Sequence, residues 1–141
     1  MGISALDIST SALVAQRIRL DAISSNIANM STMRNADGDI SPYEARFVVF
    51  QTDLENQTKH GAAGVKIASI ETSKVEPNYK FDPDHPLAIK EGPRQGMVAY
   101  PRINMTEQFV DALQATRAYE ANIGVMEISK NMGQQTLRIL A

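Results

Sequence analysis

Few side chains in this sequence could carry out covalent or metal chemistry. The 141 residues include no cysteine and only two histidines. One of these, His85, lies beside Asp84 and near Asp82, and two carboxylates with an imidazole could bind a divalent cation. Aspartate next to proline, as at Asp82-Pro83, is however typical of turns. We therefore expect a loop in this segment rather than a metal site.

The remaining candidates for catalysis or cofactor binding do not form a recognisable site. The carboxylate pairs Asp37 with Asp39 and Glu71 with Glu76 lie in turn-like or strand-flanking segments. Residues 92–96 contain two glycines but lack the lysine and the hydroxyl of a phosphate-binding loop. No serine stands in a nucleophile-elbow motif. The sequence thus predicts no catalytic residue, no cofactor, no metal and no small-molecule substrate.

Charge and hydropathy argue against two further classes of function. The net charge is -2 and neither sign forms a long run, so we expect no nucleic-acid partner. No stretch approaches the roughly 18 apolar residues that a membrane-spanning helix needs. The first ten residues lack the basic segment and apolar run of a secretory signal peptide. An extracytoplasmic location would therefore require another export route.

The beginning of the sequence has the pattern of one long helix. No proline or glycine interrupts residues 3–30, and apolar residues recur at helical spacing. A seven-residue spacing, typical of a coiled-coil seam, relates Leu6, Leu13, Leu20 and Ile27, and Ile23 and Met30 complete that stripe. A second, weaker apolar band consists of Ile8, Ala12, Ala15, Ile18 and Ala22.

The end of the sequence, residues 104–141, predicts a second long helix. Asn104 or Thr106 can cap its first turn, where the helix dipole favours Glu107, and no proline follows. One face of this helix carries Phe109, Leu113, Tyr119, Ile123, Met126 and Leu137. Another face carries Val110, Ala121, Val125, Ile128, Met132 and Ile139. Because apolar side chains occupy more than one side, a single neighbouring helix cannot cover them all.

The middle of the sequence, residues 35–103, differs from both ends in composition and period. It contains all six prolines and most of the glycines, and we expect strands at 47–50, 65–70 and 97–100. The predicted fold class is therefore mainly α with a β-rich insert. Long N- and C-terminal helices, within residues 1–34 and 104–141, would pack as a coiled-coil-like pair, with a small β domain of residues 35–103 between them.

The two predicted helices carry more apolar surface than one short chain can cover. They would be about 42 and 51 Å long at about 1.5 Å per residue, and the insert is too small to cover both. If they met only each other, the second stripes would form a larger apolar patch than monomers normally expose. We therefore expect self-association or co-assembly. Periodicity does not separate a closed dimer from an open polymer, because both bury the same stripes.

Motifs at both ends of the chain resemble one protein family. Residues 12–29, which end in Ser24-Ser25-Asn26-Ile27-Ala28-Asn29, resemble the N-terminal motif of the flagellar rod, hook and hook-associated proteins, and Thr32 fits the same pattern. Residues 117–123 (Arg-Ala-Tyr-Glu-Ala-Asn-Ile) resemble the closing helix of that family. Within the family, the short length and residues 64–70, 84–88 and 96–104 resemble a proximal rod protein.

This resemblance implies a structural subunit of the bacterial flagellar basal body and no enzymatic activity. The terminal helices of such a subunit would form a tube in the periplasm that transmits torque and passes export substrates, with the insert packed outside. The implied partners are other copies of the chain, rod proteins of the FlgB, FlgF, FlgG and FliE type, and the flagellar type III export apparatus. The alternative is a soluble helical adaptor or chaperone-like binding module that forms a closed dimer.

The predicted functional residues form an assembly interface on the two helices. In the first helix they are Leu6, Leu13, Leu20, Ile23, Asn26, Ile27 and Asn29; in the second they are Phe109, Leu113, Tyr119, Asn122, Ile123, Val125, Met126, Ile128 and Met132. We expect Asn26 to form a hydrogen bond across a helix interface. We expect Asn29 to end the first helix in the left-handed conformation that asparagine tolerates.

Overall fold

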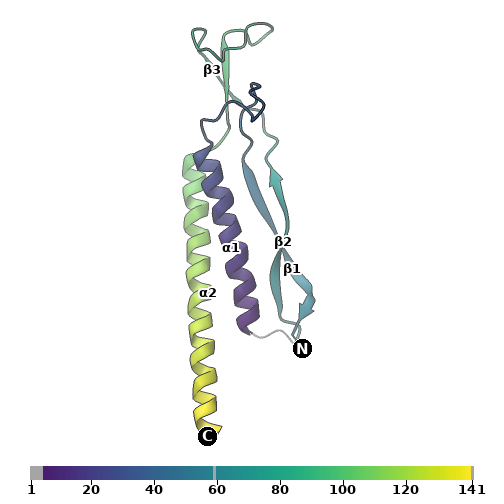
Figure 1. Ribbon diagram of the computed structural model, residues 1–141, viewed down its shortest axis with the longest axis vertical. Helices are drawn as coiled ribbons and strands as arrows, with labels where there is room; N and C mark the ends of the chain where they lie inside the picture. Colours follow the sequence, from purple (N-terminus) through teal and green to yellow (C-terminus); the bar gives the residue numbers. More distant parts are fainter. Residues whose placement is uncertain (1–4, 59, 141) are drawn as a thin grey trace.

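The computed structural model describes residues 5–58 and 60–140, which form an elongated molecule with two long helices (Figure 1). Helix α1 (Ala5–Ala28) and helix α2 (Met105–Leu140) lie side by side and antiparallel. Between them in the sequence come β1 (Arg46–Gln57), β2 (Ala63–Thr72), β3 (Asn78–Phe81) and β4 (Met97–Tyr100). Two long terminal helices with a small β region between them confirm the predicted fold class at this level.

Helix α1 ends at Ala28 by a different mechanism from the one predicted. The predicted start at Ile3 lies outside the described residues. In the described part of the chain only glycines have positive φ angles, so the prediction of a left-handed Asn29 is wrong. Asn29 Nδ2 instead donates to the carbonyl oxygen of Ser25 at 2.9 Å, and Asn29 Oδ1 accepts a hydrogen bond from Thr32 Oγ1 at 3.1 Å. The backbone N–H of Asn29 donates to the same carbonyl at 3.0 Å, so the asparagine closes the last turn with its side chain and its backbone together, without a left-handed conformation.

Helix α2 begins at a side-chain cap. Asn104 Oδ1 accepts a hydrogen bond from the backbone N–H of Thr106 at 3.0 Å, and the Asn104 carbonyl accepts one from Gln108 N at 3.1 Å. Asn104 is therefore the N-cap, and Thr106 lies inside the first turn. The helix continues over 36 residues to Leu140.

The strands form two separate antiparallel pairs. β1 pairs with β2 in a long hairpin with register irregularities between Val49 and Phe50 and between Asp53 and Gln57, and β3 pairs with β4. The structure confirms the three predicted strands and adds β3, whose sequence is Asn-Tyr-Lys-Phe. Four residues with a single alternation give too weak a signal to be found without the partner strand.

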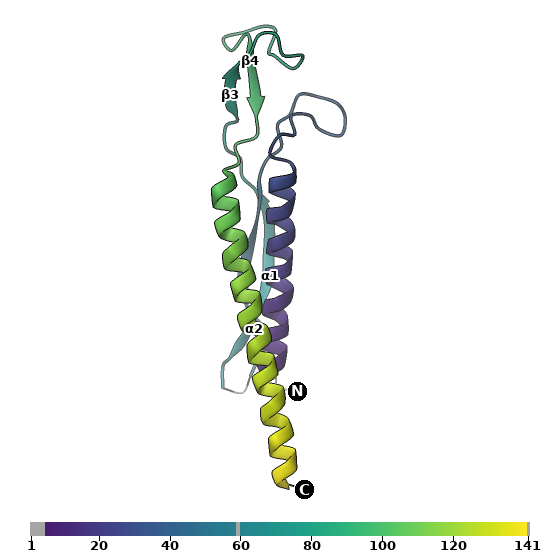
Figure 2. The same cartoon turned by 90° about the vertical axis from the view of Figure 1, so that its left-hand side faces the viewer.

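The β1–β2 hairpin packs along α1, and the shorter β3–β4 pair lies beyond the ends of the helices (Figures 1 and 2). Ser11 of α1 accepts a hydrogen bond from the backbone N–H of Val65 at 3.1 Å. The adjacent Gly64 is buried, and a Cβ at this position would lie 2.7 Å from Ser11 Oγ. The chain approaches the helix so closely here because residue 64 has no side chain.

The hairpin covers α1 only, so α1 lies between the hairpin and α2. Within the described residues, α2 closely approaches α1 and none of the strands. The buried hydrophobic residues are correspondingly few and mostly small: Ala15, Ile23, Val98, Ala99 and Ala115. The predicted coiled-coil-like packing is not confirmed, because none of the four residues at seven-residue spacing is buried: Leu6 is exposed, and Leu13, Leu20 and Ile27 are half-buried. The hairpin of the insert thus covers apolar surface of α1, and the corresponding surface of α2 has no such cover.

Candidate assembly surface

A buried asparagine joins α1 to both of its neighbours. The side chain of Asn26 is only 2% exposed. Its Nδ2 donates to Gln108 Oε1 at 2.9 Å and to the carbonyl oxygen of Arg46 at 2.8 Å. Its Oδ1 accepts hydrogen bonds from Arg46 N at 2.8 Å and from the Tyr43 hydroxyl at 3.3 Å. All four contacts lie within one chain, so Asn26 bonds across a helix interface as predicted, and that interface is internal.

The predicted interface residues fall into three groups by exposure. Ile23 and Asn26 are buried inside the chain. Leu13, Leu20, Ile27, Asn29, Tyr119, Asn122 and Met126 are half-buried. Leu6, Phe109, Leu113, Ile123, Val125, Ile128 and Met132 are exposed. This last group offers the most apolar surface to another molecule, and six of its seven members belong to α2.

Helix α2 places small and polar residues such as Ala115 and Gln108 against α1 and leaves most of its large apolar residues exposed. Ala115 is completely buried, whereas Phe109 is 56% exposed and Leu113 is 52% exposed. The Gln108 side chain binds Asn26, and Asp111 binds Arg19 of α1. Small side chains let the two helices approach closely. The consequence is an apolar helix face that no described part of the same chain covers.

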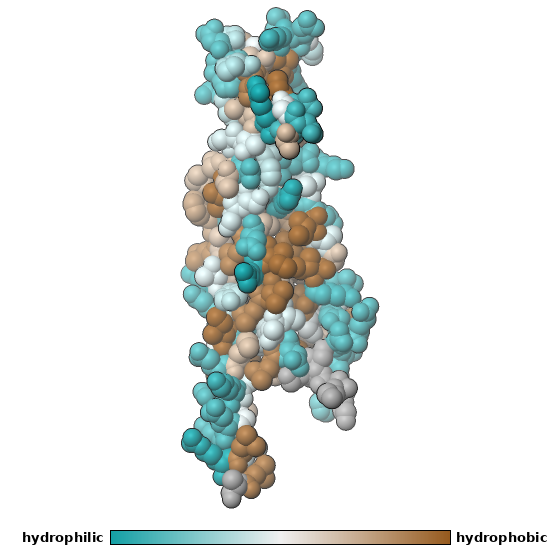
Figure 3. All heavy atoms as spheres, in the orientation of Figure 1, coloured by the Kyte–Doolittle hydropathy of each residue, from teal (hydrophilic) through white to brown (hydrophobic). Residues whose placement is uncertain are grey.

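The end of α2 extends past α1, and of its residues 131–140 the predicted interface included only Met132. Residues 131–140 are all exposed, among them Leu137, Ile139 and Leu140. Figure 3 shows brown, apolar atoms at this end of the molecule. The sequence did give a signal for this surface, because Leu137 and Ile139 belong to the two apolar faces of the predicted helix. The length by which α2 extends beyond α1 depends on the register in which the two helices pair. Helical periodicity does not determine that register.

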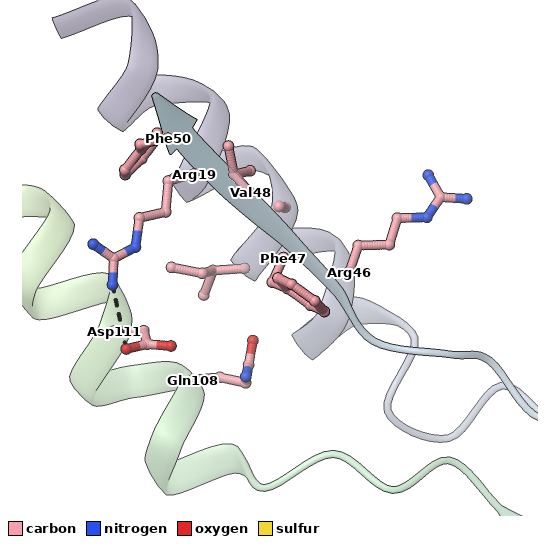
Figure 4. A pocket seen from close by; sticks show the side chains of 9 residues that line it. Arg19, Arg46, Phe47, Val48, Phe50, Gln108 and Asp111 are labelled. Atoms are coloured by element: carbon pink, nitrogen blue, oxygen red, sulfur yellow. Dashed lines mark hydrogen bonds and ion pairs between the residues drawn. The ribbon is translucent and has the colours of Figure 1, made fainter. Parts of the chain in front are cut away.

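A hollow of about 320 Å³ opens where α1, α2 and β1 meet (Figure 4). Arg19 reaches across it from α1 to Asp111 of α2, with Nη2 3.4 Å from Oδ1. Apolar side chains of β1, including Phe47 and Phe50, form another wall, whereas the side chain of Arg46 points away. No histidine or cysteine lines the hollow, and its carboxylate is paired with a guanidinium. The hollow therefore offers packing surface and no group suited to catalysis.

The loop that could have bound a metal is a turn. His85 Nδ1 accepts a hydrogen bond from Leu87 N at 3.1 Å, and His85 N donates to the carbonyl oxygen of Asp82 at 3.3 Å. Among the described residues, no three histidine, aspartate or glutamate side chains gather in a way that could hold a metal ion. Neither of the described helices is long and apolar enough to span a membrane.

Comparisons with known proteins match both helices and the whole chain. A model of flagella basal body rod proteins matches residues 6–34, and a model of the C-terminal part of flagellar basal body rod FlgEFG proteins matches residues 94–139. The flagellar basal-body rod protein FlgC of Borreliella burgdorferi is 40% identical, over 97% of this chain and 96% of the relative. The chain belongs to the FlgC family of flagellar basal-body rod proteins.

Other FlgC proteins support the same assignment at similar identity. FlgC of Bacillus subtilis is 36% identical over 95% of each chain, and FlgC of Salmonella typhimurium is 37% identical over 94% of this chain and 93% of its own. The FlgC family consists of rod proteins, so the chain is a structural subunit and not an enzyme. The alternative of a soluble adaptor or chaperone-like module has no support among these relatives.

Proposed function

We propose that this protein polymerises through its terminal helices into the proximal rod, the tubular drive shaft that transmits torque and passes export substrates. The observation that carries the proposal is the exposure of large apolar residues on both predicted apolar faces of α2: Phe109 and Leu113 on one, and Val125, Ile128 and Met132 on the other. Fully burying a side chain of this size stabilises an interface by about 1.5–3 kcal/mol before ordering costs. Neighbouring subunits cover the apolar residues of α2, as the hairpin covers α1 within the chain.

The partners and the location follow from rod assembly. The neighbours are other copies of the chain and rod proteins of the FlgB, FlgF, FlgG and FliE type. The subunit reaches the periplasm through the flagellar type III export apparatus, without a cleaved signal peptide. Membership of the FlgC family supports this proposal.

Torque transmission requires a subunit whose parts do not slide past one another. Helix α2 alone is about 54 Å long at about 1.5 Å per residue. Asn26 fixes α1 to α2 and to β1, and Ser11 fixes α1 to β2. These hydrogen bonds hold helices and hairpin in one arrangement, so that a load on one element reaches the others.

The test replaces exposed apolar residues of α2 by aspartate. Leu113→Asp and Ile128→Asp place a charge on the uncovered side of the helix, where the isolated chain tolerates it because both residues are exposed. Both variants should keep their helical circular dichroism, disappear from isolated basal bodies and fail to restore swimming to cells that lack the protein.

The matched control is Leu54→Asp on the β1–β2 hairpin. Leu54 is 66% exposed, so the control introduces the same charge at a leucine of similar exposure away from α2. It should still enter basal bodies. Normal incorporation of the two α2 variants would overturn the proposal, since the exposed side of α2 would then be unnecessary for assembly.

A further inference from the structure

The charges of α2 divide the helix into two parts of opposite sign. Residues 105–128 carry four carboxylates (Glu107, Asp111, Glu120 and Glu127) and one cation (Arg117), which gives a net charge of -3. Residues 129–140 carry Lys130 and Arg138 and no carboxylate, which gives a net charge of +2. We call residues 129–140 the overhang, because this end of α2 extends past α1 (Figures 1 and 2).

One side of the overhang lies in line with the side of α2 that packs on α1 earlier in the helix. Above the overhang, that side is marked by Ala115, which is completely buried, and by the half-buried Asn122. The same helical spacing leads to Gly133, Leu137 and Leu140. Leu137 is 69% exposed and Leu140 is 79% exposed. Apart from the adjoining residues and backbone of α2 itself, no described atom lies within 4 Å of where a Cβ on Gly133 would be. This side of the overhang is thus apolar, with open space beside its glycine and with Lys130 next to Leu137 in helical projection, whereas Arg138 lies on another side of the helix.

The part of α2 that lies along α1 presents a complementary surface. Phe109, Leu113, Glu120, Ile123 and Glu127 are all exposed and recur at intervals of three, four and seven residues, which places them on one side of the helix. We call this set the acidic outer face. It combines large apolar side chains with two carboxylates, so it matches the overhang both in hydrophobicity and in the sign of its charge.

We propose that the overhang of one copy packs on the acidic outer face of α2 in a second copy. The inference rests on the proposed rod function and names one contact within it. Contact between the two surfaces buries leucine against phenylalanine and leucine, and it brings Lys130 close to carboxylates of opposite charge, while Arg138 adds to the positive charge of the same segment. The same helix contributes both surfaces, but at different positions along its axis. Repetition of such a heterologous contact adds copies in one direction and forms an open polymer.

The charges of this contact allow a reversal experiment on the full chain. Lys130→Glu with Arg138→Glu makes the overhang acidic, and it should lower the association constant of purified protein by about tenfold at low salt. Adding Glu120→Lys and Glu127→Lys to the same chain restores opposite charges and should restore association. Lys74→Glu with Lys80→Glu is the matched control, because it reverses two exposed lysines outside α2. Light scattering against protein concentration measures association, and circular dichroism checks that each variant is folded.

The outcomes separate this inference from the proposed function. Loss of association in the double reversal and recovery in the fourfold variant support the contact. Unchanged association in the double reversal, or no recovery in the fourfold variant, overturns it. Association that stops at a dimer as concentration rises also overturns it, since a heterologous contact does not close in that way. If the charge variants associate normally while Leu113→Asp is absent from basal bodies, the rod function stands and only this contact falls.

Discussion

The side chain of Asn26 donates a hydrogen bond to Gln108 Oε1 at 2.9 Å and thereby connects the two long helices at a buried position. The same amide pairs with both the N–H and the carbonyl of Arg46, so α1 is fixed to the hairpin at the same point. Asn26 belongs to the motif by which the sequence resembles flagellar axial proteins. Its contacts show that this part of the motif holds the subunit together internally.

Replacing Asn26 by alanine should destabilise the chain by about 2–4 kcal/mol, because several buried hydrogen-bonding groups lose their partner at once. The affected groups are the Gln108 amide and the backbone of Arg46. Urea unfolding followed by circular dichroism measures the change. Asn131→Ala in the exposed overhang is the control and should shift stability by less than about 0.5 kcal/mol. Equal effects of the two substitutions would show that the Asn26 contacts contribute nothing.

The contact between Ser11 and Gly64 predicts coupled effects of substitution. Gly64→Ala should destabilise the packing of the hairpin on α1, because the new methyl group would meet Ser11 Oγ at 2.7 Å. Ser11→Ala removes that oxygen and, with it, the hydrogen bond to Val65 N. The double variant should therefore lose less stability than the sum of the two single variants, by about 0.5–1 kcal/mol. A double-mutant cycle from urea unfolding measures this coupling, and strict additivity would contradict the close approach.

The β1–β2 hairpin contains a carboxylate whose pKa the structure lowers. Asn56 Nδ2 donates to Asp53 Oδ2 at 2.9 Å, and this hydrogen bond is the main reason that the pKa of Asp53 lies below its ordinary value. The ionised form is favoured in the folded chain, so its contribution to stability is present above the unfolded pKa and is lost as pH falls through the folded one. Asn56→Ala should raise the pKa of Asp53, as measured by NMR titration. An unchanged pKa would exclude the Asn56 amide as the cause.

Removing the overhang should separate folding from assembly. A chain that ends at Ile128 loses the overhang, in which Ser129 is half-buried and residues 130–140 are all exposed, so its free energy of unfolding should change by less than about 0.5 kcal/mol. The same chain should not enter basal bodies. Chemical unfolding and immunodetection in isolated basal bodies measure the two effects, with the full-length chain as reference. A large loss of stability would mean that the overhang contributes to the fold of the single chain.

The sequence by itself determined the type of each main element and the family of the protein. Uninterrupted helical spacing at both ends, and alternation in segments such as 65–70, are local properties that persist without tertiary contacts. Asn104 could be predicted as a cap because its role depends only on the first turn of its own helix. The motifs around Asn26 and Tyr119 identified the family in the same local way.

Only the tertiary structure decided which apolar faces are covered within the chain and which are left for other molecules. The pattern put Ile23 and Leu113 in one predicted interface, yet Ile23 is buried inside the chain and Leu113 is exposed on α2. The physical reason is that the hairpin packs on α1 alone, because Gly64 lets it approach Ser11. Helical periodicity shows that a residue lies on an apolar face, but coverage of that face depends on segments distant in sequence.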